Sequence, residues 1–322
     1  MMRLLRYDVL APLAAADHPA LGYFVRRDLL GQAPEPIDEL WDSPHALRVV
    51  GRQQPDGRWR YAGGDPAIRS ADNYDQLETY RQLGVLVCKY GCTRRHPAVR
   101  RAMAFLRSFQ TDAGDYRGID GNQYTPNYTA AITELLIRAG YAHSPQVGVA
   151  LQWLHTVRQD DGGWVIPPRT RGLPLLSMMT TAETIEPDRA CPSSHLITGI
   201  VLRALAAHPA QRRTSATRRA GDLLKARFFT RDTYPDHASA SYWQIFSYPF
   251  WWTDLLSALD SLTTAGFRTN DPDIAAGLTW FIDHQQPNGL WNTGHNRPKG
   301  HDSDLWVALA ICRLLDRAQL DP

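Results

Sequence analysis

Two kinds of segment alternate along the chain, and the spacing of their hydrophobic residues predicts helices. Segments of the first kind are amphipathic and end at a short glycine turn; they are residues 45–54, 96–110, 144–159, 215–229 and 271–286. Segments of the second kind are richer in small and apolar residues; they are residues 19–31, 73–90, 127–140, 193–208, 249–266 and 302–317. A helix that is apolar on most sides is buried on most sides, so we expect the second kind to form an inner layer.

The turn between the two kinds of segment recurs with a similar sequence. It is Gln-Pro-Asp-Gly-Arg-Trp at residues 54–59, Gln-Asp-Asp-Gly-Gly-Trp at 159–164 and Gln-Pro-Asn-Gly-Leu-Trp at 286–291, with a looser copy at 110–116. Glycine permits the left-handed backbone that ends a helix, and the aromatic ring packs back on the helix end. The wide gap before the last copy predicts a degenerate copy at residues 228–236.

About six inner helices alternating with five to six outer ones predict an all-α fold, a single (α/α)6 toroid domain over residues 1–322. Residues 165–190 interrupt the alternation and contain Pro167, Pro168 and Pro174. This insertion is longer than an ordinary connection, so we expect it to form a lid or a loop on the rim of the ring.

Composition narrows the class of protein. The 35 basic and 33 acidic side chains leave a net charge of +2, which excludes a nucleic-acid binder that works through bulk charge. Four unevenly spaced cysteines do not suggest a disulfide scaffold, so we expect free thiols and a cytoplasmic protein. No apolar stretch is long enough to predict a membrane span. The sequence does not decide between a protein that contacts a membrane surface and one that does not, and it does not indicate an oligomeric state.

The Gln-x-x-Gly-x-Trp turns resemble the QW repeats of class II terpenoid cyclases of the squalene-hopene cyclase type. The helical register also resembles the β-subunits of protein prenyltransferases. The resemblance extends over roughly residues 40–317 and implies a central cavity that opens where the inner helices begin. Because the motif is structural, it informs the fold more than the chemistry. Known class II cyclases generally pair two such domains, and this chain has one, which leaves substrate size and activity open.

Carboxylates lie at the expected starts of two inner helices, residues 72–78 and 302–304. The family implies an Asp-x-Asp-Asp acid, and this chain lacks that motif. A carboxylic acid stays protonated where neighbouring carboxylates and a low dielectric disfavour its charge. The alternative is that these aspartates only cap helices. The candidate catalytic residues are Asp75, Glu78, Asp302 and Asp304, with His301 as a proton relay.

Aromatic residues gather in the block from 242 to 252. Ring faces stabilise cations, most strongly in a dry cavity, although an ordinary aromatic core or a sugar-stacking platform also fits the pattern. The candidate substrate-binding residues are Tyr74, Tyr124, Tyr128, His195, Tyr242, Trp243, Tyr248, Trp251, Trp252 and Trp306.

A cofactor is not predicted. Prenyltransferases hold zinc through an Asp-x-Cys and a histidine, and here the corresponding start is Trp-Trp-Thr-Asp at residues 251–254. A set of Cys191, His195 and His301 or Asp302 is conceivable, but its four-residue spacing is common by chance, so zinc is disfavoured. Magnesium is expected only if the substrate carries a diphosphate. The candidate groups to bind such a diphosphate are helix starts and the rim arginines Arg69, Arg169 and Arg171.

The first hypothesis is therefore an enzyme, of the isomerase or lyase class, that cyclises a polyprenyl-derived substrate after protonating it. A second is another carboxylate-dependent enzyme on the same toroid, acting on a glycan or a peptide-derived substrate. A third is a non-catalytic toroid that binds a hydrophobic ligand or a protein. The third hypothesis predicts that the candidate carboxyl groups all cap helices, and that no carboxyl group with a shifted pKa faces the cavity.

Overall fold

A computed structural model describes residues 5–295 and 302–319, and every structural statement below refers to these ranges. They form helices and loops with only isolated bridges, which confirms the all-α class. The α-helices are α1 (Leu10–Ala14), α2 (Pro19–Asp28), α3 (Pro44–Val50), α4 (Ala71–Tyr90), α5 (Pro97–Arg107), α6 (Pro126–Leu136), α7 (Pro145–Thr156), α8 (Leu175–Thr180), α9 (His195–Ala207), α10 (Ser215–Lys225), α11 (Leu255–Thr264), α12 (Pro272–Asp283) and α13 (Ser303–Gln319).

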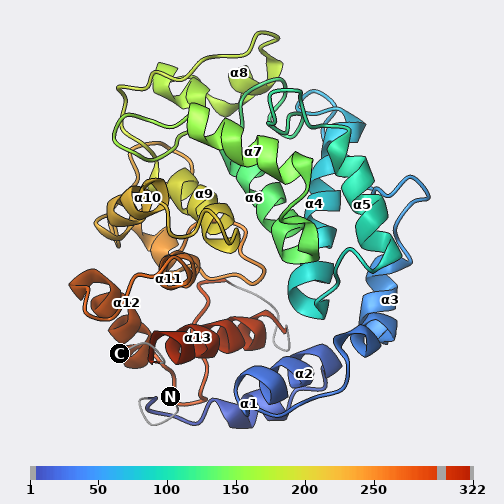
Figure 1. Ribbon diagram of the computed structural model, residues 1–322, viewed down its shortest axis with the longest axis vertical. Helices are drawn as coiled ribbons and strands as arrows, with labels where there is room; N and C mark the ends of the chain where they lie inside the picture. Colours follow the sequence, from blue (N-terminus) through green and yellow to red (C-terminus); the bar gives the residue numbers. More distant parts are fainter. Residues whose placement is uncertain (1–4, 296–301, 320–322) are drawn as a thin grey trace.

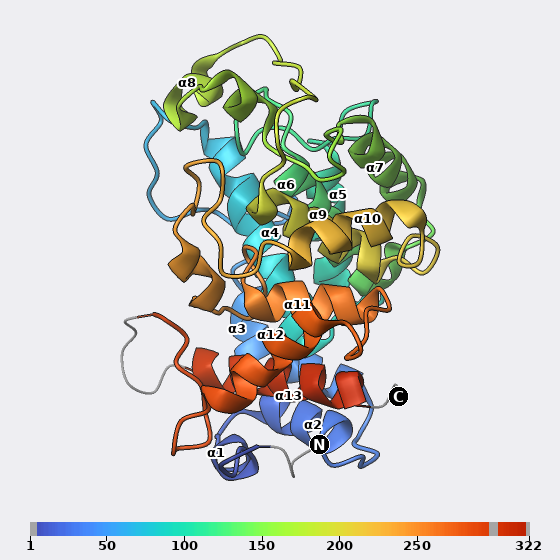
Figure 2. The same cartoon turned by 90° about the vertical axis from the view of Figure 1, so that its left-hand side faces the viewer.

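The inner helices form a closed ring. In the order α2, α4, α6, α9, α11 and α13, each packs on the next, and α13 returns to α2 (Figures 1 and 2). The outer helices α3, α5, α7, α10 and α12 each pack on an inner neighbour. None of the helices in the described ranges is both long and apolar enough to cross a membrane.

Several helices start where the sequence offers a capping side chain followed by proline. Ser43, Ser144 and Asp271 each accept a hydrogen bond from a backbone N–H in the first turn, and proline occupies the next position. Proline loses no hydrogen bond at this position, and its fixed φ already suits a helix. These local signals are why the predicted helix starts agree with the structure.

The glycine turns fix the outer layer to the inner one. In each, the indole N–H donates to a carbonyl ten residues earlier at the end of the outer helix; the pairs are Trp59–Val49 (2.8 Å), Trp164–Leu154 (2.6 Å) and Trp291–Phe281 (2.6 Å). The backbone N–H groups of Trp59 and Trp164 also donate to threonines of the next inner helix. Each turn therefore joins an outer helix to the inner helix that follows.

In the turns at residues 54–59 and 286–291, the glutamine that binds the turn lies one residue earlier than the motif suggests. The Gln53 amide donates to the Gly57 carbonyl at 3.0 Å and to the Ala98 carbonyl of the next outer helix at 2.9 Å. Gln110 and Gln285 do the same in their turns. Gln54, which the motif highlights, donates only to the nearby Arg52 carbonyl. The register of the motif in the sequence analysis was therefore shifted by one residue at this turn.

The N-terminal segment closes the outer layer. Tyr7 donates its N–H to the Gln285 side chain at 2.9 Å and accepts from the same amide at 3.0 Å. Gly289 packs so closely that an added Cβ would lie 2.2 Å from the Asp8 carbonyl oxygen. The helix α1 that follows packs on α2 and α13. Residues 7–14 thus take the position of the outer helix after α12.

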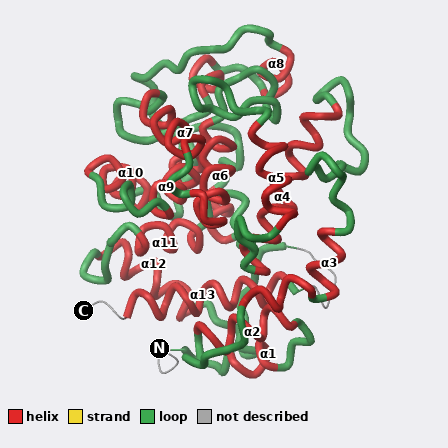
Figure 3. The backbone as a smooth tube through the Cα atoms, turned by 45° about the vertical axis from the view of Figure 1, so that its right-hand side comes forward, coloured by secondary structure: helices red, strands yellow, loops and turns green. Residues whose placement is uncertain are grey.

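The insertion at residues 165–190 lies over one end of the ring, where Figure 3 shows the loops around α8. It contains a 3-10 helix, Pro167–Arg171, and α8. The Gln123 amide, from the loop between α5 and α6, donates to the Thr181 and Glu183 carbonyls at 3.1 and 2.8 Å. These contacts hold the insertion over the loops that precede the inner helices, and we call residues 165–190 the roof.

Candidate functional site

A cavity of about 280 Å³ lies beneath this roof, where α6 and α9 begin. Its apolar wall comes from Tyr80, Tyr128, Ala131, Ile166, Leu196, Ile197, Ile200, Trp251 and Trp252. Its polar groups are Arg69, Asp120, Asn127, Asp236 and His237. The wall is mostly apolar, and its few polar groups stand together, which is the usual composition of a small-molecule site.

Four aromatic rings form one side of the cavity. The Tyr80 ring meets the Trp251 ring edge-on at 5.6 Å and the Tyr128 ring edge-on at 6.1 Å. Residue 84 of α4 is glycine, and a Cβ there would lie 2.9 Å from the Trp251 ring. The Trp252 indole donates to the Ile245 carbonyl at 2.9 Å, which fixes that ring. The aromatic side is therefore held in place by packing and hydrogen bonds.

Asp120 enters the cavity from a tight turn between α5 and α6. Gly118 and Gly121, with φ of 112° and 66°, pair their backbone groups at 2.9 and 3.0 Å around it. Both conformations lie in the region that glycine adopts without steric cost. The Asp120 side chain is buried, and Arg69 lies 3.5 Å from its Oδ1.

The surroundings of Asp120 favour its protonated form. Burial raises the pKa of this carboxyl to about 6, against the opposing charge of Arg69, and the nearby Asp236 carboxylate adds to the increase. A carboxyl group in an apolar site holds its proton to higher pH because the charged form is poorly solvated. Asp120 is therefore an acid that can hold a proton close to neutral pH inside an aromatic cavity.

His237 lies beside Asp236 on the loop before α11. Burial lowers the pKa of its imidazole, so the ring is neutral and able to accept a proton. The ring stacks on Tyr242 at 4.4 Å and meets Trp252 edge-on at 5.9 Å. Its backbone has φ of 49°, a conformation that residues other than glycine adopt at a cost and that clusters at functional sites.

The predicted catalytic residues do not line this cavity. Asp75 accepts from the Tyr61 N–H at 2.9 Å and lies 3.3 Å from the Arg58 guanidinium, and Glu78 accepts from Gln82. Asp304 accepts from the Thr293 hydroxyl at 3.0 Å. The Asp75 and Asp304 carboxylates thus hold the loops that precede their helices, and the structure does not bring the predicted acids together.

Asp302 also lies away from the cavity. It accepts from the Trp306 indole at 3.0 Å and from Lys89 at 3.2 Å. Although burial opposes it, the charge of Lys89 holds the pKa of Asp302 below its usual value, so this carboxyl stays ionised. His301, the predicted relay, lies outside the described residues.

The predicted aromatic residues divide into three groups. Those that line the cavity are Tyr128, Trp251 and Trp252, and Tyr242 stands behind His237. Tyr74 and Tyr124 hold loops, through bonds to Asp65 and Glu186. The third group lies away from this cavity: His195, Trp243 and Trp306 pack in the core, where His195 lies 3.5 Å from Asp232 and Trp243 donates to the Thr230 carbonyl, and Tyr248 lines pockets where the inner helices end.

Sequence reasoning missed Asp120, Asn127, Asp236 and His237. It looked for acids at the starts of inner helices, and Asp120 precedes such a start by several residues. The Gly-Ile-Asp-Gly sequence at 118–121 was a usable signal, because two glycines around an aspartate predict a tight turn. The predicted degenerate turn at residues 228–236 is a loop whose Asp232 accepts from Ser194 and the Leu196 N–H at the start of α9.

A metal site does not emerge from the described residues, which contain no group of three or more histidine, cysteine, aspartate and glutamate side chains able to hold an ion. Cys191 directs its Sγ toward the Thr170 carbonyl, and the His195 ring faces Asp232. The conceivable zinc pair of Cys191 and His195 is therefore not assembled in this part of the chain.

The family model of the squalene-hopene cyclase C-terminal domain matches residues 76–168. The match covers part of the chain and agrees with the resemblance to terpenoid cyclases that the repeated turns carry. The matched segment contains six of the residues that line the cavity, namely Tyr80, Asp120, Asn127, Tyr128, Ala131 and Ile166.

Among solved structures, similar chains include a polysaccharide lyase, at 10% identity and a TM-score of 0.44, covering 88% of this chain and 86% of that one. The type II terpene cyclase MstE from Scytonema is similar at 14% identity and a TM-score of 0.39, over 88% of this chain and 99% of that chain. A protein from Actinoplanes is similar at 16% identity and a TM-score of 0.29, over 85% and 99%. No curated protein matches the sequence.

Proposed function

We propose that this protein cyclises a polyprenyl-derived substrate by protonating it, and that Asp120 is the proton donor. The observation that carries the proposal is a buried carboxyl group with a raised pKa in a cavity walled by tyrosine and tryptophan rings. An acid that retains its proton and rings that stabilise a cation are the two requirements of such a reaction. Asp120 here replaces the acids that the sequence analysis predicted.

The reaction conserves all atoms of the substrate. The O–H proton of Asp120 goes to one carbon of an alkene, whose π electron pair forms the new C–H bond and leaves a cation on the neighbouring carbon. Further alkene π pairs attack that cation and close rings. Loss of a C–H proton to the neutral imidazole of His237 ends the sequence and restores an alkene. The product is an isomer of the substrate, and no oxidant or metal is required.

The remaining wall suits a hydrocarbon chain. Ile166, Leu196 and Ile200 line the cavity together with the aromatic rings and offer no groups that hydrogen-bond to water. A volume of about 280 Å³ lies just below the usual range of ligand pockets, about 300 to 1,000 Å³. This volume favours a short polyprenyl chain over a long one.

The polar side of the cavity supports a second candidate, a lyase that acts on an acidic glycan. Arg69 and Asn127 line the cavity and can hydrogen-bond to a uronate carboxylate, with Arg69 supplying the positive charge, and Tyr128 and His237 can exchange protons with the sugar. The tryptophan rings would then serve as stacking platforms. The apolar residues on the facing wall favour the cyclase, because a sugar has hydroxyl groups that such a wall leaves unpaired.

A turnover assay with matched variants tests the proposal. We expect wild-type protein to convert farnesyl or geranylgeranyl substrates into cyclic isomers, and Asp120→Asn to lower the rate by about 10²–10⁴-fold, because the amide is not an acid. Asp75→Asn is the control, since Asp75 lies outside the cavity wall. Equal activity of Asp120→Asn and wild type, with both variants folded by thermal melting, rejects the proposal. Unsaturated sugar products from uronate glycans support the lyase instead.

A further inference from the structure

The opposite mouth of the ring, where the inner helices end, is rich in arginine. Three adjoining pockets of about 110, 250 and 280 Å³ lie there, and Arg138 lines all three. We call them together the arginine chamber. Its arginines are Arg27, Arg138, Arg203, Arg212, Arg313 and Arg317.

The carboxylates around the chamber do not balance this charge. Glu134 pairs with Arg138 and Arg203, at 2.9 Å in each case, so one carboxylate serves two guanidinium groups. Asp260 pairs with Arg317 at 2.7 Å. Asp28 serves both Arg27 and Arg313. Among the described residues, six arginines therefore face three carboxylates, which leaves a surplus of positive charge at this mouth.

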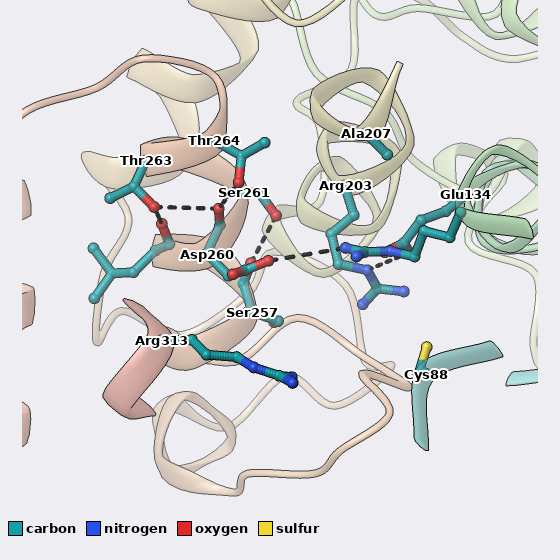
Figure 4. Close-up of polar contacts among 12 residues, drawn as sticks. Cys88, Glu134, Arg203, Ala207, Ser257, Asp260, Ser261, Thr263, Thr264 and Arg313 are labelled. Atoms are coloured by element: carbon teal, nitrogen blue, oxygen red, sulfur yellow. Dashed lines mark hydrogen bonds and ion pairs between the residues drawn. The ribbon is translucent and has the colours of Figure 1, made fainter. Parts of the chain in front are cut away.

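Several guanidinium groups keep donors that can reach a ligand. Arg138 donates to Glu134 through Nε, its next carboxylate is Asp260 at 3.9 Å, and 40% of its side chain is exposed. Arg313 reaches from α13 toward the space that Glu134 and Asp260 border, as Figure 4 shows. Its Nε and Nη2 pair with Asp28 and its Nη1 donates to the Tyr248 hydroxyl at 3.3 Å, so each Nη keeps one further N–H. The Nε of Arg212 is buried and has no hydrogen-bond partner. A buried N–H without an acceptor destabilises the folded protein, and a bound anion would accept its hydrogen bond.

The chamber and the aromatic cavity are neighbours across Tyr80, Ala131 and Trp251, which line both. We infer that the arginine chamber binds a diphosphate group. A diphosphate matches the surplus charge, and its oxygens suit the paired donors of guanidinium groups on different helices. The group is either free pyrophosphate or the headgroup of a prenyl diphosphate whose chain lies in the cavity, and the second case rests on the proposed function.

The arginines at the other mouth are less available. From the sequence, the candidate ligands for a diphosphate, if the substrate carries one, are helix starts and the rim arginines Arg69, Arg169 and Arg171. In the structure Arg169 pairs with Asp236, Arg171 lies 3.4 Å from Asp188, and Arg69 pairs with Asp120. Each of these three guanidinium groups has a carboxyl group of its own as partner, whereas the chamber arginines share theirs.

A structural role for the chamber arginines makes a different prediction. Arg317 donates to the Asp260 carbonyl at 2.9 Å and Arg212 to the Ala207 carbonyl at 3.4 Å, so both offset the negative ends of helices. If all six served only this purpose, the chamber would have no affinity for anions. Arg138 distinguishes the two roles, because its Nε donates to the Glu134 carboxylate and not to a carbonyl at a helix end.

Titration calorimetry with inorganic pyrophosphate tests the inference. We expect wild-type protein to bind pyrophosphate and Arg138→Gln to bind it at least about tenfold more weakly, because a charged hydrogen bond is lost. Glu134 keeps Arg203 as its partner in this variant, so the fold is preserved. The matched control is Arg52→Gln, which removes one positive charge from an exposed position beyond α3. We expect this control to bind pyrophosphate like the wild type.

No measurable binding to wild-type protein, or equal weakening by Arg138→Gln and Arg52→Gln, overturns the inference. Tighter binding of farnesyl diphosphate than of pyrophosphate identifies the headgroup of a prenyl substrate, and equal binding identifies the free anion. Pyrophosphate binding without any cyclic product upholds the chamber and rejects the cyclase. Cyclisation of a prenyl alcohol without pyrophosphate binding upholds the cyclase and rejects the diphosphate site in the chamber.

Discussion

At the scale of single residues, the property that matters most is the proton affinity of Asp120. Its turn presents the carboxyl group to an apolar cavity, with Arg69 at 3.5 Å as the nearby cation. One cation at that distance does not offset the loss of hydration, so burial dominates and the pKa rises to about 6. The same carboxyl on the surface would be ionised at neutral pH and unable to protonate an alkene.

This pKa predicts how stability depends on pH. The folded pKa of about 6 lies above the value of about 3.9 expected in the unfolded chain, so the folded state binds more protons between the two. The contribution of Asp120 to stability is therefore greatest below pH 4 and declines as pH rises to about 6. Asp120→Asn, which stays neutral, should gain on the order of 2–3 kcal/mol relative to wild type between pH 4 and pH 7. Urea unfolding at several pH values measures this difference. A difference that is flat from pH 4 to pH 7 would contradict the assigned environment.

The site could be predicted in part from the sequence. Tyr128, Trp251 and Trp252 were found, because aromatic residues near the starts of inner helices were the features sought. Asp120 was not, because its flanking glycines indicate a tight turn but do not indicate that the carboxyl group is buried in a cavity. Its acidity depends on burial among Ile166, the loop at 236–237 and Arg69, which are distant in the sequence. Asp75 was predicted to be a catalytic acid because the sequence does not show its ion pair with Arg58, which the fold brings close from the preceding turn.

At the scale of elements, the glycine turns decide how the layers join. Gly114 has φ of 110°, and an added Cβ would lie 2.4 Å from the Val149 carbonyl oxygen of α7. Gly63 has a similar φ of 95° but no atom within 4 Å of that position. The two positions share the backbone conformation and differ in how closely the next outer helix approaches.

Alanine at these two glycines should therefore have different costs. Gly63→Ala should lower the free energy of unfolding by about 1–2 kcal/mol, from the left-handed backbone alone. Gly114→Ala adds a clash with the backbone of α7, so we expect a total loss of about 3 kcal/mol or more. Chemical denaturation of both variants measures the pair. Equal losses would show that close approach is not what requires glycine in the turns.

Most elements could be predicted because their signals are local. The Ser-Pro and Asp-Pro starts and the turn glycines gave the order of inner and outer helices. The one-residue shift of the bridging glutamine could not be seen, because Gln53 and Gln54 are adjacent and only the position of Ala98 in space distinguishes them. The same holds for residues 7–14, whose outer position depends on a contact with Gln285.

At the scale of the whole molecule, the ring depends on the joint between its two ends. Gln285 makes two hydrogen bonds to Tyr7, and α13 packs on both α1 and α2. Gln285→Ala removes both bonds to Tyr7 and one to Gly289, so we expect a loss of about 2–3 kcal/mol. Faster amide hydrogen exchange in residues 7–14 should accompany it. The control is Gln54→Ala, whose amide bonds only within its own turn. Similar exchange in the two variants would contradict this closure of the ring.

The ring also separates the two chemistries assigned to the molecule. The acid and the aromatic rings lie at the mouth where α6 and α9 begin, under the roof of residues 165–190. The arginine surplus lies at the mouth where the inner helices end. Trp251 borders both spaces, so a ligand with a hydrocarbon chain and an anionic end has a complementary surface for each part.

The source of the proton is the most direct test of this account. Cyclisation of an unlabelled polyprenyl substrate in D₂O, followed by mass spectrometry, should give a product that carries one solvent deuterium at the carbon that Asp120 protonates. Asp120→Asn should give no such product under the same conditions. A cyclic product without deuterium, or a deuterated product formed by Asp120→Asn at the wild-type rate, would contradict the central claim that Asp120 starts the reaction.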